Sequence, residues 1–204
     1  MGLDNVYQAM PENCSLLERS RYDADFGANL TDFEQCAAAA QEEIDERGND
    51  QTYLDFVSAA KLLCKERPQL FERRLFLGRR WDMIHYLLSE ERRRGYCAND
   101  SDWVKRFIHG GEVLNEYIKD ISGHHIFYLA PGEVSELWIK LGDITSETFR
   151  EHWNPSLMYE AGVYKMHAAD DERQLEYIET DFNDLRNLFF EAMTHDEGIL
   201  NWCF

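Results

Sequence analysis

Long apolar runs and paired cysteines are both missing from this sequence. No stretch approaches the roughly 18 apolar residues of a membrane-spanning helix, and no basic-then-apolar leader stands near the first residue. The sequence therefore predicts neither a membrane span nor a secretion signal. The five cysteines are scattered and form no CxxC pair, which is typical of reduced thiols in the cytoplasm rather than of disulfides or a zinc site. We expect a cytoplasmic protein.

Basic residues are scarce. The chain has 21 Lys and Arg against 39 Asp and Glu, which gives a formal net charge of −18 at pH 7. Binding to nucleic acid needs a basic face for the phosphates, so we exclude a general nucleic-acid binder. A charge of this sign and size would attract basic partners, although high solubility alone also accounts for it. Both interpretations stay open.

The fingerprints of common catalytic and cofactor sites are absent. There is no GxSxG, no HExxH, no GxGxxG and no Walker-type lysine after a glycine-rich loop. His124 and His125 are adjacent, so on a strand their side chains point to opposite faces and cannot share one ion. His195 and Glu197 lie at a predicted helix end, where the helix dipole already favours a histidine. We therefore expect no cofactor and no metal, and the sequence leans away from an enzyme.

One domain over residues 1–204 is expected, since a chain of this length can bury a core of its own. Apolar residues recur every three or four positions from Leu175 to Ala192, which predicts a long helix ending before Gly198. Pro131 and Gly142 bound another helix. Strands are predicted over 124–129 and 199–204. Shorter helices are predicted near 79–95, 101–109 and 145–154, and residues 157–166 are expected to be irregular.

The N-terminal part is predicted to be largely helical after a first strand within residues 1–10. Thr31 and Glu34 have the spacing of a capping box, which predicts a helix that ends near Gly48. A second helix begins near residues 49–52 and ends before Pro68, because the residue before a proline disfavours helix. The two form a helical hairpin. Many helices with a few strands indicate one α/β or α+β domain.

The candidate site lies between Arg79 and Glu112. His85 shares a helical stripe with Trp81, and Asp82 lies three residues before it, in reach to orient it as a general base. His109 and Glu112 flank two glycines and are candidates for an acid–base pair or two metal ligands. The alternatives are a half-buried structural histidine at position 85 and an ordinary tight turn at the glycines.

Further binding candidates surround these residues, because two glycines let the backbone approach a ligand and arginines take phosphate or carboxylate. They are Trp81, Trp103, Gly110, Gly111, Arg79 and Arg80. Residues 65–94 hold nine basic and five acidic side chains, a net of +4 in an acidic chain. This basic segment either binds an acidic group or pairs with acidic helices of the same chain, such as 170–197.

Several motifs, in this order, resemble the YfbM-like family of bacterial proteins. They are WDMIHYLL at 81–88, FIHGGE at 107–112, YLAPGEV at 128–134, GVY at 162–164 and GILNW at 198–202. The resemblance covers roughly the last two thirds of the chain, whereas residues 1–75 diverge and carry extra helical material. It implies a three-layer α/β/α sandwich with a small mixed sheet. It implies no particular reaction.

Two functional hypotheses follow. The first is a non-enzymatic binding protein whose acidic surface takes a basic protein, with an inhibitor or immunity-type protein as its concrete form. The second is a small-molecule sensor or enzyme with a pocket around His85, His109 and Glu112. The second requires these three side chains and Trp81 to converge on one cavity, and the first requires a coherent acidic or apolar face.

Overall fold

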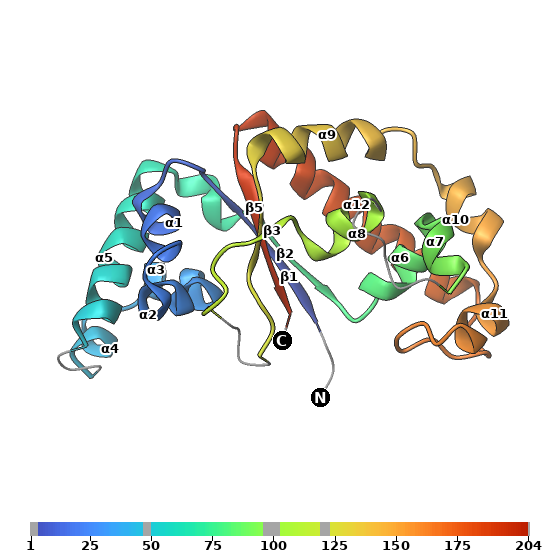
Figure 1. Ribbon diagram of the computed structural model, residues 1–204, viewed down its shortest axis with the longest axis horizontal. Helices are drawn as coiled ribbons and strands as arrows, with labels where there is room; N and C mark the ends of the chain where they lie inside the picture. The colour runs from blue at the N-terminus through green and yellow to red at the C-terminus, as the bar shows by residue number, and fades with distance from the viewer. Residues whose placement is uncertain (1–3, 47–49, 96–102, 119–122, 204) are drawn as a thin grey trace.

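Three layers make up the molecule in the computed structural model, which describes residues 4–46, 50–95, 103–118 and 123–203. A central sheet separates N-terminal helices on one face from the later helices on the other (Figure 1). This is the α/β/α sandwich that the family resemblance implied, and it belongs to the helix-rich α+β class as a single domain. No helix among the described residues is both long and apolar enough to cross a membrane.

The sheet has five strands in the order β2-β1-β5-β4-β3. Their bounds are β1 Asn5–Met10, β2 Arg74–Gly78, β3 Glu112–Val113, β4 Phe127–Leu129 and β5 Gly198–Cys203. Every pairing among the described strands is antiparallel, so the mixed sheet expected from the resemblance is wrong in this respect. The reason is visible at β1 and β2: the intervening helices return the chain to the end where it left, with Gln8 opposite Arg74.

The two faces of the sheet are distinguished by alternate residues of β1, because successive side chains on a strand point in opposite directions. The amide of Gln8 donates to the Leu70 carbonyl at 3.0 Å, so Gln8 faces the N-terminal layer. The hydroxyl of Tyr7 donates to the Ile108 carbonyl at 2.5 Å, so Tyr7 faces the later helices. This alternation decides where each candidate residue lies.

The N-terminal layer is built from short helices around one long one. They are α1 Ser15–Ser20, α2 Ala24–Gly27, η1 Ala28–Asp32, α3 Phe33–Ala38, α4 Gln41–Glu46, α5 Gln51–Glu66 and η2 Pro68–Phe71. The second predicted helix is confirmed as α5, which the carboxylate of Asp50 caps by accepting from the Tyr53 amide at 3.1 Å. The first is interrupted, since Ala39 has extended backbone (ψ 128°) between α3 and α4.

The predicted capping box at Thr31 is wrong. Its hydroxyl donates to the Ala28 carbonyl at 3.3 Å within η1, and α3 begins only at Phe33. A 3-10 turn that precedes the helix satisfies backbone groups that a capping side chain would otherwise serve.

The other layer contains the remaining helices. They are α6 Trp81–Leu88, α7 Glu90–Arg93, α8 Trp103–His109, α9 Pro131–Leu141, α10 Ser146–His152, α11 Pro155–Glu160 and α12 Glu172–Thr194. α9, α10 and α12 confirm the predictions. The predicted N-cap at residues 99–101 lies outside the described residues.

At two places the observed helices differ from the predicted ones for the same reason: a polar side chain caps the start of a new helix. The predicted helix over 79–95 breaks where the Ser89 hydroxyl accepts the Arg92 amide at 3.1 Å and starts α7. Residues 157–166 were expected to be irregular, but Asn154 accepts the Leu157 amide at 3.1 Å and Pro155 occupies the first turn of α11.

Candidate functional site

Four rings from three segments meet on the later-helix face of the sheet. The rings of His85 and His109 lie 5.7 Å apart between centroids, edge to face, and His109 is 4.9 Å from Trp81. Trp81 also stacks on Tyr164 at 5.8 Å. The structure thus brings together α6, the end of α8 and the segment after α11. His85 is buried, and His109 and Trp81 are half-buried.

Asp82 does not orient His85. Its carboxylate accepts two hydrogen bonds from the Arg92 guanidinium, at 3.0 and 2.9 Å, and one from the Tyr164 amide at 2.9 Å. The side chain is buried, so these bonds compensate the cost of removing a charge from water. Asp82 therefore ties α6 to α7 and to the segment carrying Tyr164, and the dyad proposed for general-base work is not formed.

The two glycines after His109 let the chain press against the sheet. Gly110 has a φ of +89°, and a Cβ at this position would lie 2.6 Å from the Cβ of Phe127. A Cβ on Gly111 would lie 2.5 Å from the Tyr128 carbonyl oxygen. Both positions therefore require glycine for a tight passage between α8 and β3, which is the turn interpretation.

A buried polar cluster holds the end of α8 in place, and sequence reasoning missed it. The Ile108 carbonyl accepts from both Tyr7, at 2.5 Å, and the Asn5 amide, at 3.1 Å. The Cys203 thiol donates to Asn5 at 2.9 Å, and the Asn201 amide donates to the Val6 carbonyl at 3.3 Å. Burial raises the pKa of the Tyr7 phenol, so the hydroxyl stays a donor. This cluster fixes where His109 lies.

Glu112 faces the N-terminal layer. It is the cross-strand partner of Tyr128, which pairs with Leu200, which in turn pairs with Gln8. Directly opposed residues share a face of a sheet, and Gln8 bonds to the N-terminal layer. The Glu112 carboxylate pairs with Arg21 at 2.9 Å. The structure therefore does not unite Glu112 with the two histidines.

Glu112 instead helps to line an open cleft of about 480 Å³. The other lining residues are Glu12, Asn13, Glu18 and Arg21. The Arg21 guanidinium lies over the ring of Tyr128, 5.4 Å from its centroid. Within the described part of the chain, Glu12 and Glu18 form neither an ion pair nor a hydrogen bond through their side chains.

All eight arginines of the basic segment bind partners within this chain. The ion pairs are Arg67–Glu197, Arg73–Glu197, Arg74–Glu34, Arg79–Asp4, Arg80–Asp181, Arg92–Asp82 and Arg94–Glu90. Arg93 donates to the carbonyls of Tyr86 and Leu87. The intramolecular interpretation of this segment is confirmed.

The most deeply buried of these pairs, Arg73–Glu197, joins the two layers. Glu197 is fully buried and receives two 2.7 Å hydrogen bonds from Arg73, which is itself buried. Arg67 adds a third bond at 3.2 Å. A carboxylate without solvent is tolerable only with such charge-assisted bonds.

The remaining candidates are dispersed. Trp103 packs on Phe107, 6.5 Å between centroids, with the Lys140 ammonium over its ring. Among the described residues, no three His, Cys, Asp or Glu side chains gather as metal ligands do. Burial raises the pKa of the Cys14 thiol and raises that of Cys64 to about 11, so neither has the lowered pKa of a nucleophile.

The family model for a domain of unknown function, DUF1877, matches residues 29–202. The chain belongs to this family. The match includes α3 to α5, so it begins further towards the N-terminus than the motifs quoted above. A search of curated proteins gives no match.

The fold also resembles a solved structure, that of YfbM from Escherichia coli, a protein of unknown function. The two share 14% sequence identity, with a TM-score of 0.58 over 98% of this chain and 99% of that one. At this identity the likeness shows the fold alone. The likeness covers the N-terminal helices as well, so the fold that the two proteins share includes both layers.

Proposed function

We propose that this chain is a non-enzymatic, cytoplasmic binding protein that takes a basic protein partner at the cleft formed by Glu12, Glu18 and Glu112. An inhibitor or immunity-type protein is the concrete form. The observation that supports it most is the state of Glu12 and Glu18, which line the cleft and have no cation partner in the described chain. Arg21 also lines the cleft, but it pairs with Glu112, so the charges of Glu12 and Glu18 can attract Lys and Arg side chains of a partner.

Aromatic side chains beside the cleft suit such a contact. Tyr22 and Tyr117 are 85% and 86% exposed. The Asn115 amide donates to the carbonyls of Ser20 and Arg21, at 3.1 and 3.2 Å, and its oxygen accepts the Tyr117 amide at 2.9 Å. Asn115 therefore holds the Tyr117 loop against the chain just before Tyr22. Tyrosine is enriched in protein interfaces and attracts cations through its ring.

The rival hypothesis of a catalytic pocket needs a carboxylate beside the two histidines, and neither candidate carboxylate is available there. His85 and His109 do meet, but Glu112 lies on the other face and Asp82 is occupied by Arg92. The acidic cleft, by contrast, joins residues from β1's end, α1 and β3 on one surface.

The test is affinity capture from the native cytoplasm with matched variants. The wild-type chain is expected to retain one stoichiometric basic protein at low salt, with the amount falling as ionic strength rises. Glu12→Gln/Glu18→Gln should release it. Glu172→Gln/Glu176→Gln on the exposed face of α12 changes the net charge equally and should keep it. Retention of no basic partner, or equal loss in both double variants, would overturn the proposal.

A further inference from the structure

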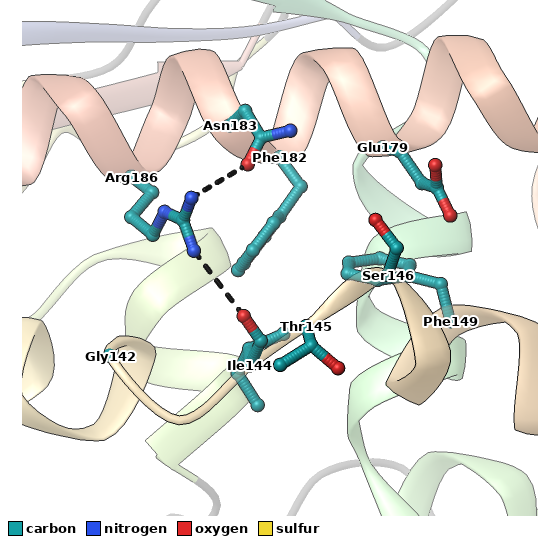
Figure 2. A pocket seen from close by; sticks show the side chains of 9 residues that line it. All are labelled: Gly142, Ile144, Thr145, Ser146, Phe149, Glu179, Phe182, Asn183 and Arg186. Atoms are coloured by element: carbon teal, nitrogen blue, oxygen red, sulfur yellow. Dashed lines mark hydrogen bonds between the residues drawn. The ribbon is translucent and has the colours of Figure 1, made fainter.

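A second cavity, of about 290 Å³, lies on the far side of the sheet from the acidic cleft, between α12 and the loop that enters α10 (Figure 2). One wall is a face of α12 with Glu179, Phe182, Asn183 and Arg186. The loop residues Thr145 and Ser146 form the facing wall. The volume is at the lower end of the range for ligand sites, which suits a molecule of amino-acid size.

Glu179 marks one end of this cavity. Its Oε1 is buried and accepts no hydrogen bond from the described residues, and its side chain is only 16% exposed. Arg150 forms a long ion pair with this oxygen: its Nε lies 4.0 Å away, beyond hydrogen-bond reach, and its side chain is 62% exposed. A buried carboxylate oxygen without a donor costs free energy, so a cationic donor placed here would be stabilised.

Arg186 marks the other end. Its guanidinium donates to two neutral acceptors, the Ile144 carbonyl at 3.3 Å and the Asn183 side-chain oxygen at 3.0 Å. No carboxylate pairs with it among the described residues. The chain has a net charge of −18, yet the hydrogen-bond partners of this arginine are neutral. The positive charge of its guanidinium at the cavity wall can therefore pair with an anionic ligand.

The floor between the two ends is aromatic. The rings of Phe149 and Phe182 are buried and lie 4.9 Å apart. The Arg186 guanidinium lies 5.6 Å from the Phe182 centroid, which holds it over the ring. Figure 2 shows Phe182 between the Arg186 and Glu179 side chains along α12. Glu179 and Arg186 are seven positions apart, about 10 Å along the helix axis.

We propose that this cavity binds a small zwitterion with its amine at Glu179 and its carboxylate at Arg186. The methylene groups of such a ligand would cover Phe149 and Phe182, and the hydroxyls of Thr145 and Ser146 line the same space. An ω-amino acid or a short peptide has this chemistry. The site is independent of the acidic cleft and shares no residue with it.

The test uses the full chain and a defined set of probes in isothermal titration. The zwitterions are 4-aminobutanoate, 6-aminohexanoate and 8-aminooctanoate, and the single-charge controls are hexanoate and hexylamine. One zwitterion is expected to bind at least about tenfold more tightly than either control, because each end adds a charge-assisted bond. Failure of all three zwitterions to bind better than both controls would overturn the proposal.

Two variants assign the ends. Glu179→Gln should abolish the advantage of 6-aminohexanoate over hexanoate, and Arg186→Gln should abolish its advantage over hexylamine. Arg150→Gln is the matched control, since Arg150 pairs with Glu179 from outside the cavity lining and competes with the ligand's amine, so the zwitterion affinity should not fall. If Glu179→Gln and Arg186→Gln keep the wild-type preferences while remaining folded by circular dichroism, the assignment is wrong.

Discussion

His109 and Glu112 are three positions apart in the chain, yet they serve opposite faces of the sheet. His109 contacts His85 and Trp81 in the later-helix layer, whereas Glu112 pairs with Arg21 in the N-terminal layer. Gly110 and Gly111 carry the backbone across the sheet edge between them. The motif therefore works as a crossing point between layers.

Replacing Gly110 by alanine should destabilise the protein strongly. The residue has a φ of +89° and its new Cβ would meet the Phe127 Cβ at 2.6 Å. We expect a loss of about 2–4 kcal/mol in the free energy of unfolding, from strain and overpacking together. Urea denaturation measures it. Gly132→Ala, in α9 with nothing near its Cβ, should be neutral or slightly stabilising. Equal effects of the two substitutions would contradict the crossing role.

Glu197→Gln should cost about 3–5 kcal/mol of unfolding free energy, because it leaves the buried guanidinium of Arg73 without its counter-charge. Glu34→Gln provides the comparison. It removes a surface pair with Arg74 and should cost under about 1 kcal/mol. A small loss for Glu197→Gln in urea denaturation would show that the layers are not joined through this pair.

Removing the Tyr7 hydroxyl should loosen the end of α8. Tyr7→Phe deletes the 2.5 Å bond to the Ile108 carbonyl, which keeps only the Asn5 amide. The expected loss is about 1–2 kcal/mol, together with faster amide hydrogen exchange in residues 103–111. Tyr22→Phe, on an exposed side chain, should change neither quantity. Unchanged exchange in the Tyr7 variant would refute the link.

Stability should fall above about pH 10, the ordinary pKa of tyrosine. Burial raises the pKa of Tyr7 and of Tyr128 in the folded state. Above pH 10 the unfolded chain releases these protons and the folded chain retains them, so each phenol removes up to about 1.4 kcal/mol per pH unit. Urea midpoints at pH 9 and pH 11 test this. Tyr128→Phe should show a shallower decline than wild type, and an identical decline would be contrary evidence.

Sequence periodicity was sufficient for the long elements and insufficient for the site. α12 and α9 were predictable because their apolar spacing and their proline and glycine boundaries agree. α11 was not, because Asn154-Pro155 reads equally well as the end of one helix and the start of the next. Ser89 likewise fits a helix pattern while capping a new one.

The polar cluster of Asn5, Tyr7, Asn201 and Cys203 comes from the two ends of the chain, and no local pattern reveals which strands will be neighbours. The faces of His109 and Glu112 depend on that same strand order. Predicting the contact between His85 and His109 would have required the relative placement of α6 and α8. The sequence alone indicated both residues as candidates only through their residue types.

The central pair of the sheet joins Asn5 to Cys203, and this has a consequence for synthesis. β1 is synthesised before the other described strands, whereas its neighbour β5 is synthesised after them. Until β5 is made, one edge of β1 lacks this partner, and the polar cluster that positions α8 lacks Asn201 and Cys203. The sheet shared by the two helical layers can therefore close only after both layers have been synthesised.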